Sequence, residues 1–450
     1  MSTEDPKLKE SPSAPDSRLK QTVGILVLLY FALRLPWLFM VPMVGAPDEF
    51  SHFWVLKFMA EYLRLPEAAE VMAGGPSAVY GSLPQIGYLP HVFTARLLPL
   101  IPLPWLSTCD LSVTARFGSL LIGLPLLLSS IYMGRKLFPD RLSQNALPLL
   151  VVFHPQLILV HTYINNDSTA ISLAAAVIVL LTRMLFHGPS LPLTCLTGLT
   201  CGFLALTKYS AYAVFPATLL GLLLAFHKAK TPPLQVLLHL LLCAASALTV
   251  SLWWFLRTLK LYPGDLLGTK TMFRTWAITY HRDLNFYMTP WQVMKEHRWW
   301  RSILFSFWGL FGYMDIYLWR WVYWTYFGYM LLALTTSLTA AFSFLKNLRK
   351  EKPADENLAR AYTWAVLGTT LIGNIMAMVY ASTVNLGGGQ GRYLFPSEIP
   401  IMSILVAGLN LTGNWRKPLV LSLIIFNAIV SIGCFIYLFP RYGFHFIRTY

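Results

Sequence analysis

The chain has 450 residues, of which 56% are hydrophobic and only 12% carry a charge, about half the share found in soluble domains. So few charges cannot cover the surface of a soluble protein of this size; the composition therefore predicts a polytopic membrane protein and excludes a water-soluble enzyme, a coiled coil and a disordered scaffold. The formal net charge is +15, and membrane proteins concentrate basic residues in cytoplasmic loops and beside anionic lipid heads, so we expect membrane lipid rather than nucleic acid as a partner.

Residues 1–21 are polar and rich in Ser, Pro and Lys, which predicts a disordered cytoplasmic tail. The rest, 22–450, is predicted to be one all-α membrane domain with about eleven transmembrane helices of roughly 20 residues each. Two outer loops are larger than the others: 41–111, with amphipathic helices, and 257–321. The apolar stretches predicted to span the membrane are 22–40, 112–133, 145–164, 168–186, 191–207, 209–227, 233–256, 322–345, 361–382, 396–411 and 419–439.

The distribution of basic residues predicts the orientation of these helices. With the N-terminus inside, the short cytoplasmic segments carry about twice as many Lys and Arg residues as the short outer segments, as the positive-inside rule requires. We therefore expect an N-inside, C-outside protein. In this orientation the unusual polar clusters of the sequence all lie at the outer face.

The first polar cluster follows the first apolar stretch. Pro47 suits the first turn of a helix, which places Asp48 and His52 four residues apart, and Glu49 and His52 three apart, on one helix face. A carboxylate paired with an imidazole can transfer a proton or hold a divalent metal ion. The alternative is that Asp48 and Glu49 only stabilise the start of a helix through its dipole.

Two more clusters fall at predicted outer ends. Asn165, Asn166 and Asp167 are typical of a turn and an N-cap for the next helix. Lys208 lies between two apolar stretches, where it offers a cation to an anionic ligand or extends to the membrane surface.

The last cluster is the glycine-rich run 387–391 before Arg392. Backbone amides of such a run, together with the planar guanidinium of Arg392, suit a phosphate. The structural alternative is an ion pair between Arg392 and Glu398. The outer loop 257–321 is basic and rich in tryptophan, which is typical of an interfacial belt and also suits a lipid-linked phosphate with a stacked sugar ring.

Four motifs, in this order, resemble those of the GT-C membrane glycosyltransferases and, more closely, of the bacterial DUF2142 family. The resemblance covers roughly residues 25–440. One stretch departs from it, because residues 83–88 with His91 stand where the family often has an HPPLYY-like sequence. The matching residues are Pro47-Asp48-Glu49-Phe50-Ser51-His52, then Phe153-His154-Pro155-Gln156 with Asn165-Asn166-Asp167, then Leu206-Thr207-Lys208-Tyr209, and finally Gln390-Gly391-Arg392-Tyr393-Leu394-Phe395-Pro396.

This resemblance implies a GT-C-like fold and a function in assembling cell-envelope glycans or glycoconjugates. The donor would be a sugar on a polyprenyl phosphate, the acceptor a hydroxyl of a glycan, lipid or protein, and the location the outer face of the bacterial plasma membrane. Asp48 would be the catalytic base, and Glu49 and His52 would orient it or bind a divalent metal ion. The residues implied to bind substrate are His52, Asn166, Asp167, Lys208, Arg392 and Tyr393.

A transporter or flippase for a lipid-linked saccharide is the main alternative. Transporters place polar groups and broken helices near the middle of the bilayer, whereas the clusters here lie at helix ends on one side. Arg34, inside the first apolar stretch, is the exception, and it is expected either to reach the membrane surface or to pair within the membrane. A third alternative is a catalytically silent relative that acts as an assembly partner.

Overall fold

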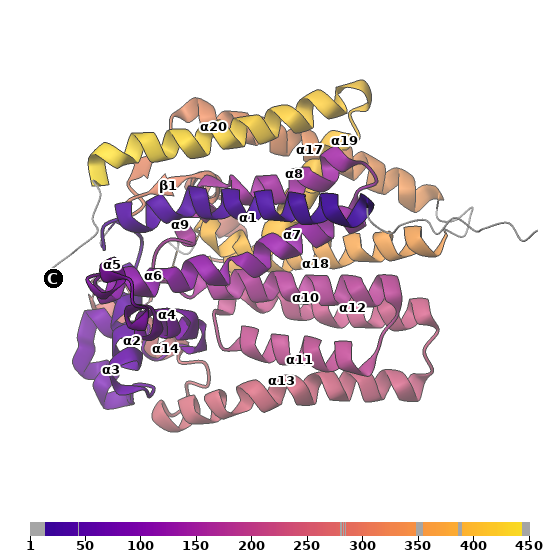
Figure 1. The fold of residues 1–450 in the computed structure, drawn as a ribbon. Coiled ribbons are helices and arrows are strands. Elements are labelled where there is room, and N and C mark those ends of the chain that lie inside the picture. Colours follow the sequence, from indigo (N-terminus) through magenta and orange to yellow (C-terminus); the bar gives the residue numbers. More distant parts are fainter. Residues whose placement is uncertain are drawn as a thin grey trace, which may run out of the picture.

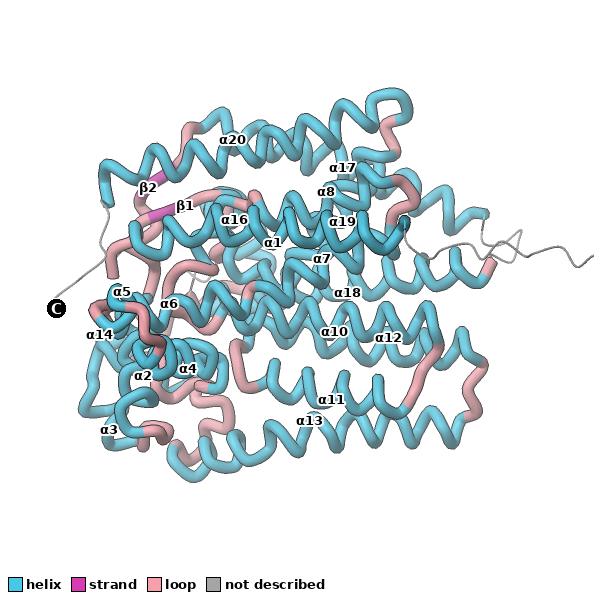
Figure 2. Tube along the Cα trace, in the orientation of Figure 1, coloured by secondary structure: helices cyan, strands magenta, loops and turns pink. Residues whose placement is uncertain are grey.

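The computed structural model describes residues 14–43, 45–279, 281, 283, 285–347, 354–385 and 389–442. Long helices lie side by side, and a group of short helices covers one end of them (Figure 1). Helix is also the dominant element along the chain trace, with a single short hairpin among the described residues (Figure 2). The predicted all-α membrane architecture is confirmed.

Eight helical segments of the described residues are long and apolar enough to cross a membrane, and they correspond to eight of the eleven predicted spans. Several consist of two consecutive helices, or of a 3₁₀ turn and a helix. Their elements are α1 (Ala14–Met40), α6 (Leu111–Ile122) with α7 (Leu124–Leu137), α10 (Asp167–His187), η4 (Tyr209–Ala213) with α12 (Val214–Ala229), α13 (Pro233–Leu261), α18 (Asp355–Val384), η6 (Gly391–Ser397) with α19 (Glu398–Asn410), and η7 (Gly413–Trp415) with α20 (Arg416–Tyr442).

The other three predicted spans are not among these eight segments: one is broken into two helices, one is a short helix, and one lies within a single long helix. Stretch 145–164 is broken into α8 (Arg141–Val152) and α9 (Pro155–Val160), because a proline lacks the amide hydrogen and disfavours helical geometry in the residue before it. Stretch 191–207 forms α11 (Leu191–Ala205), which has only 15 residues. Stretch 322–345 lies within α17 (Arg320–Asn347).

Two predicted boundaries need correction. Helix α1 begins at Ala14, inside the segment 1–21 predicted as a disordered tail, because Arg, Lys, Leu and Gln in its first turns are good helix formers. Residues 1–13 of that tail lie outside the described residues. Helix α13 continues to Leu261, so the outer loop predicted at 257–321 starts later than expected.

The short elements come from the two predicted outer loops and gather at one end of the long helices (Figure 1). Inward-facing side chains of the first loop, such as Val55 and Tyr88, form a small core with Ile164. The first loop holds α2 (Glu49–Tyr62), α3 (Ala68–Gly74), η1 (Gly75–Ala78), η2 (Ile86–Tyr88), α4 (Leu89–Leu97), η3 (Leu98–Leu100) and α5 (Pro104–Ser107). The second holds α14 (Thr269–Thr279), α15 (Pro290–Lys295), α16 (His297–Trp308) and the antiparallel pair β1 (Leu310–Phe311) and β2 (Ile316–Tyr317).

Arg34 joins α1 to the end of α8 and is fully buried. Its guanidinium donates hydrogen bonds to the carbonyl oxygens of Val152 and Val151, at 3.1 and 3.2 Å, and lies over the ring of Tyr30. The last carbonyls of a helix lack partners within the helix and carry the negative end of its dipole, so they suit a cation. Arg34 is therefore not extended toward a surface, and it has no acidic partner within salt-bridge distance among the described residues; its contacts join α1 to α8.

Candidate active site

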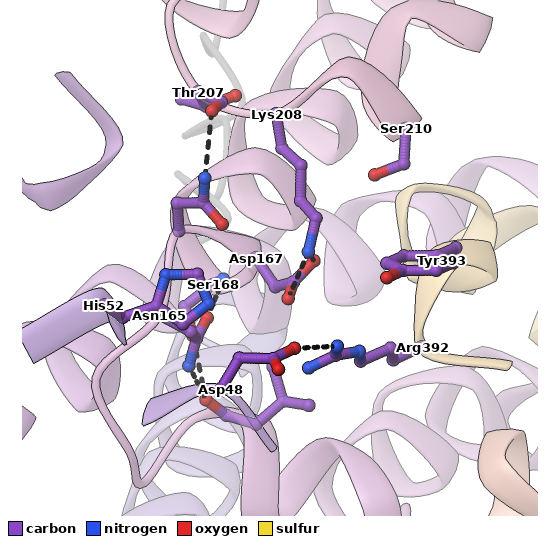
Figure 3. Close-up of polar contacts among 12 residues, drawn as sticks. Asp48, His52, Asn165, Asp167, Ser168, Thr207, Lys208, Ser210, Arg392 and Tyr393 are labelled. Carbon is purple, nitrogen blue, oxygen red and sulfur yellow. Dashed lines mark hydrogen bonds and ion pairs between the residues drawn. The ribbon is translucent and has the colours of Figure 1, made fainter. Parts of the chain in front are cut away.

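Four charged side chains from distant parts of the sequence meet at the end covered by the short helices. Asp48 directly precedes α2, Asp167 begins α10, Lys208 lies between α11 and η4, and Arg392 lies in η6. Figure 3 shows the two carboxylates facing the two cations, with Tyr393 beside them. Asp48 and Arg392, from the first and the last of the polar clusters expected at one face, are in direct contact.

The closest contact of the site joins Asp48 to Arg392. Oδ2 of Asp48 lies 2.5 Å from Nη2 of Arg392. The Arg392 side chain is 5% exposed and that of Asp48 is 24% exposed. Burial alone would raise the pKa of the Asp48 carboxyl, but the Arg392 guanidinium outweighs burial and holds this pKa below its usual value. Asp48 also has left-handed backbone geometry, with φ 63° and ψ 4°, which is costly for a residue other than glycine.

A second ion pair lies next to the first. The Lys208 ammonium is 2.7 Å from the Asp167 carboxylate, which is almost fully buried, and it also lies 4.9 Å from the ring centre of Tyr393. The guanidinium carbon of Arg392 lies 5.4 Å from the same ring, so Tyr393 contacts both cations. The Asn166 amide donates to the carbonyl oxygen of Thr207 and so ties the start of α10 to the Lys208 segment.

His52 is buried beside Asp48 in an aromatic setting. Its ring stacks on Tyr80, with centroids 4.6 Å apart, and its Nδ1 lies 2.5 Å from the Tyr88 hydroxyl. Burial lowers the pKa of His52 to about 3, so the imidazole is neutral near pH 7. Burial also keeps the Tyr88 phenol protonated, by raising its pKa, so a neutral imidazole and a neutral phenol share this hydrogen bond.

Glu49, although next to Asp48 in sequence, belongs to a different contact. The Arg116 guanidinium donates hydrogen bonds to both of its carboxylate oxygens, at 2.7 and 2.6 Å, and the Ile164 amide donates to the same carboxylate. Arg116 also donates to the carbonyl oxygens of Leu38 and Val41, at the end of α1 and just beyond it. Both side chains are buried. This network holds α1, α2, α6 and the turn before α10 together around the Asp48 backbone.

A divalent metal ion does not fit the residues suggested for it. The Glu49 carboxylate is held by Arg116, and Nδ1 of His52 is hydrogen-bonded to the Tyr88 hydroxyl. Within the described ranges, no group of three or more His, Cys, Asp and Glu side chains is arranged to hold a metal ion. The positive charge offered by the site comes instead from Lys208 and Arg392.

Glu398 does not pair with Arg392, as the structural alternative required. Its carboxylate lies 2.8 Å from Nδ1 of His154, whose Nε2 lies 2.7 Å from the carbonyl oxygen of Phe307. This buried contact joins the break between α8 and α9 to α16 and α19. Arg392 is left to face Asp48.

Helix α16 supports the Arg392 segment from behind. The Gly391 amide donates to the Ser306 hydroxyl at 2.7 Å, and a β-carbon at residue 391 would overlap the backbone of Phe307 and Ile303. Only glycine allows this approach. The glycine of the last motif therefore has a packing reason, independent of any ligand.

Several buried polar atoms at the site have no hydrogen-bond partner among the described residues. They are Nε of Arg392, Oγ of Ser210 and Oδ1 of Asn166. Figure 3 shows the Ser210 hydroxyl directed toward the space between Lys208 and Tyr393. An unpaired buried polar atom is costly, so this arrangement indicates a place for a polar ligand.

The sequence alone does not single out four residues that shape the site. Arg116 looks like any basic residue near a helix end, and Tyr80 and Tyr88 look like interfacial aromatics. Ser210 directly follows the motif that contains Lys208, and this proximity is its only signal in the sequence. All of them gain their significance from contacts between segments far apart in the chain.

Comparison with solved structures identifies the fold. The chain superimposes on ArnT from Cupriavidus metallidurans bound to undecaprenyl phosphate with a TM-score of 0.50 and 14% identity, covering 95% of this chain and 66% of ArnT. It also superimposes on the oligosaccharyltransferase of Archaeoglobus fulgidus with a TM-score of 0.50 and 15% identity, covering 96% of this chain and 56% of that enzyme. The chain has the GT-C fold of these membrane glycosyltransferases.

The chain thus spans between about half and two thirds of the length of these two structures. No protein-family model matches the sequence, and a search of curated proteins gave no match.

Replacing Arg116 tests whether the Glu49 contact holds the outer end together. Arg116→Ala leaves a buried carboxylate without its cation, and we expect a loss of about 3–5 kcal/mol in the free energy of unfolding. The double variant Glu49→Leu with Arg116→Leu removes both charges and should recover part of this loss. Thermal unfolding in detergent measures both; equal stability of Arg116→Ala and the unchanged protein would contradict a structural role for the pair.

Gly391→Ala tests the approach of α16. The added methyl group overlaps backbone atoms, so we expect a destabilisation of roughly 1–3 kcal/mol. The matched control is Gly368→Ala in α18, where nothing lies within 4 Å of the new β-carbon and helix propensity improves. If thermal unfolding showed the same midpoint for both variants, the close packing at Gly391 would be wrong.

Proposed function

We propose that the protein is a glycosyltransferase that moves a sugar from a polyprenyl-phosphate donor to an acceptor hydroxyl at the outer face of the bacterial plasma membrane. The acceptor would be a glycan, lipid or protein in cell-envelope or glycoconjugate assembly. The observation that carries this proposal is the contact of Asp48 with Arg392, immediately beside the Asp167–Lys208 pair. A base and two phosphate-binding cations are thereby within reach of one substrate.

The two cations suit the phosphate of the donor. The guanidinium of Arg392 is a planar fork of hydrogen-bond donors, and the ammonium of Lys208 is a compact positive charge. Both groups bind phosphate oxygens as well as they bind carboxylates. In the resting site each cation is neutralised by a carboxylate, so phosphate binding exchanges one anionic partner for another. The unpaired Nε of Arg392 and hydroxyl of Ser210 offer further donors.

The transfer step follows from these positions. The acceptor oxygen forms a bond to C1 of the sugar while the bond from C1 to the phosphate oxygen breaks, and the acceptor proton passes to the Asp48 carboxylate. The donor phosphodiester carries one negative charge, and the polyprenyl phosphate that leaves carries two. Fixed cations stabilise the charge that develops on the leaving oxygen.

Among the acidic residues, Asp48 is the best candidate for the base. Its carboxylate is ionised at neutral pH, partly exposed, and released from Arg392 when the phosphate takes that cation. Glu49 is occupied by Arg116 and would support the backbone at Asp48. His52, being neutral, would position the acceptor or shape the pocket, and Asp167 would hold Lys208.

The location of the site supports an enzyme over a transporter. The charged residues lie together, at or next to the ends of α2, α10, α11 and α19, where the prenyl tail of a donor can remain in the bilayer. Arg34, the one polar residue that suggested a transport path, is fully used in joining α1 to α8. The structural neighbours include one bound to undecaprenyl phosphate, and the ordered motifs resemble the DUF2142 family, which supports the same donor class.

Asp48→Asn tests the base. The amide keeps the shape but cannot accept the acceptor proton, so we expect sugar transfer by the folded protein to fall by about 10²–10⁴-fold. The variant also leaves Arg392 without a carboxylate partner, so we expect a lower midpoint of thermal unfolding and compare transfer at equal amounts of folded protein. Transfer of a labelled sugar from a polyprenyl phosphate to envelope acceptors, in proteoliposomes, measures this. Glu61→Gln, which alters an exposed carboxyl of α2, is the control and should keep normal transfer. Full activity of Asp48→Asn would remove Asp48 as the base.

Arg392→Gln tests the electrostatic partner through the pH profile. A base must be deprotonated, so kcat/KM falls as pH drops through the pKa of Asp48. Arg392 holds this pKa low, whereas burial alone raises it, so the acidic limb should move to higher pH in Arg392→Gln. The exposed Arg96→Gln on α4 removes the same charge and should leave the limb in place. The unchanged enzyme should show no inflection near pH 6.5 from His52, and an unshifted limb in Arg392→Gln would contradict the pairing.

A further inference from the structure

A second basic pocket lies where α13 ends beside the connection between α2 and α3. It is an open depression of about 450 Å³ whose lining includes Arg64, Glu67, Trp253, Arg257 and Lys260. The Arg257 guanidinium donates to the carbonyl oxygen of Pro66 at 2.7 Å, which fixes α13 against this connection. Figure 1 shows the end of α13 next to α3, on the side of the molecule that also carries α2.

Two basic residues of the pocket, Arg257 and Lys260, have no carboxylate within salt-bridge distance among the described residues, although the Glu67 carboxylate also belongs to the lining. The third, Arg64, is paired with Glu70 at 2.5 Å. The partner of Arg257 is a neutral carbonyl, which leaves further guanidinium donors. Trp253, Arg257 and Lys260 follow at spacings of four and three residues and so share one face of α13.

The same helix, α13, has an exposed apolar surface adjacent to this pocket. The α13 side chains near its C-terminal end include Leu248, Leu252, Leu256 and Leu259, each at least 43% exposed. Such a surface on a helix that can cross the membrane contacts lipid chains. Trp253 lines the pocket and is itself 42% exposed, and it has the amphipathic character of residues at the headgroup level.

The pocket is separate from the candidate active site. Asp48 precedes α2 and Arg64 follows it, and this helix of 14 residues is roughly 20 Å long. The lining residues of the pocket include none of the four charged residues that meet at Asp48.

We propose that this pocket binds the phosphate headgroup of a membrane lipid whose acyl chains lie along the exposed apolar side of α13. Arg257 and Lys260 would contact the phosphate, and Trp253 would pack on the glycerol region. The bound lipid would anchor the connection between α2 and α3 to the bilayer. It would thereby also hold α2, the helix that follows Asp48. The site is independent of the sugar-transfer chemistry.

Lipid binding to the purified full chain is measured by native mass spectrometry with phosphatidylglycerol. In the double variant Arg257→Gln with Lys260→Gln, we expect the population of the one-lipid complex to fall by about tenfold, and in Lys260→Gln alone by about threefold. Lys260 is exposed and makes no described ion pair, so the single variant leaves the fold intact. The matched control is Lys228→Gln with Lys230→Gln, at the C-terminal end of α12, which removes the same charge near the other end of α13 and should retain the complex.

Two companion ligands distinguish the sources of the phosphate. Diacylglycerol, which has the same chains without the phosphate, should form no complex that depends on Lys260. Inorganic phosphate, which lacks the chains, should bind far more weakly than the lipid. Equal losses in the two double variants, or full binding in Lys260→Gln, would overturn the site, and inorganic phosphate binding as tightly as the lipid would overturn its assignment to a lipid.

Discussion

The contact between the Asp48 carboxylate and the Arg392 guanidinium is the interaction on which the functional end of this protein depends. Both side chains are largely shielded from solvent, and a charge at such a position is tolerated only with a partner of opposite sign. The adjacent Asp167–Lys208 pair repeats the arrangement. The site is thus stable without substrate, yet its cations remain available, because a phosphate can replace the carboxylates as their partner.

The surrounding scaffold explains why these charges meet. Arg116 joins the end of α1 to Glu49 at the start of α2, so the residue between these helices, Asp48, has little freedom. On the opposite side, His154 and Glu398 join α16 to α19, and Gly391 lets α16 approach the Arg392 segment closely. These contacts are buried and polar, which makes them costly to break singly. The molecule therefore separates residues that position the site from residues that face a substrate.

The sequence was sufficient for the fold class and for most membrane-crossing helices, because long apolar stretches such as that of α10 have no other stable environment. It also indicated Asp48, Asp167, Lys208 and Arg392, because charged groups at helix ends on one side are unusual. It could not assign partners. Glu49 and Glu398 were each compatible with a site or a structural contact, and the choice depended on Arg116 and His154, distant in sequence. The break between α8 and α9 was missed because hydropathy outweighed the proline.

The most direct measurement is a density map of the protein with a polyprenyl phosphate bound in a lipid nanodisc. The account predicts the phosphate between Lys208 and Arg392, with oxygens about 3 Å from both cations, and the Asp48 carboxylate released from Arg392 toward the space for an acceptor. A phosphate bound elsewhere, with the contact between residues 48 and 392 intact, would contradict the central claim.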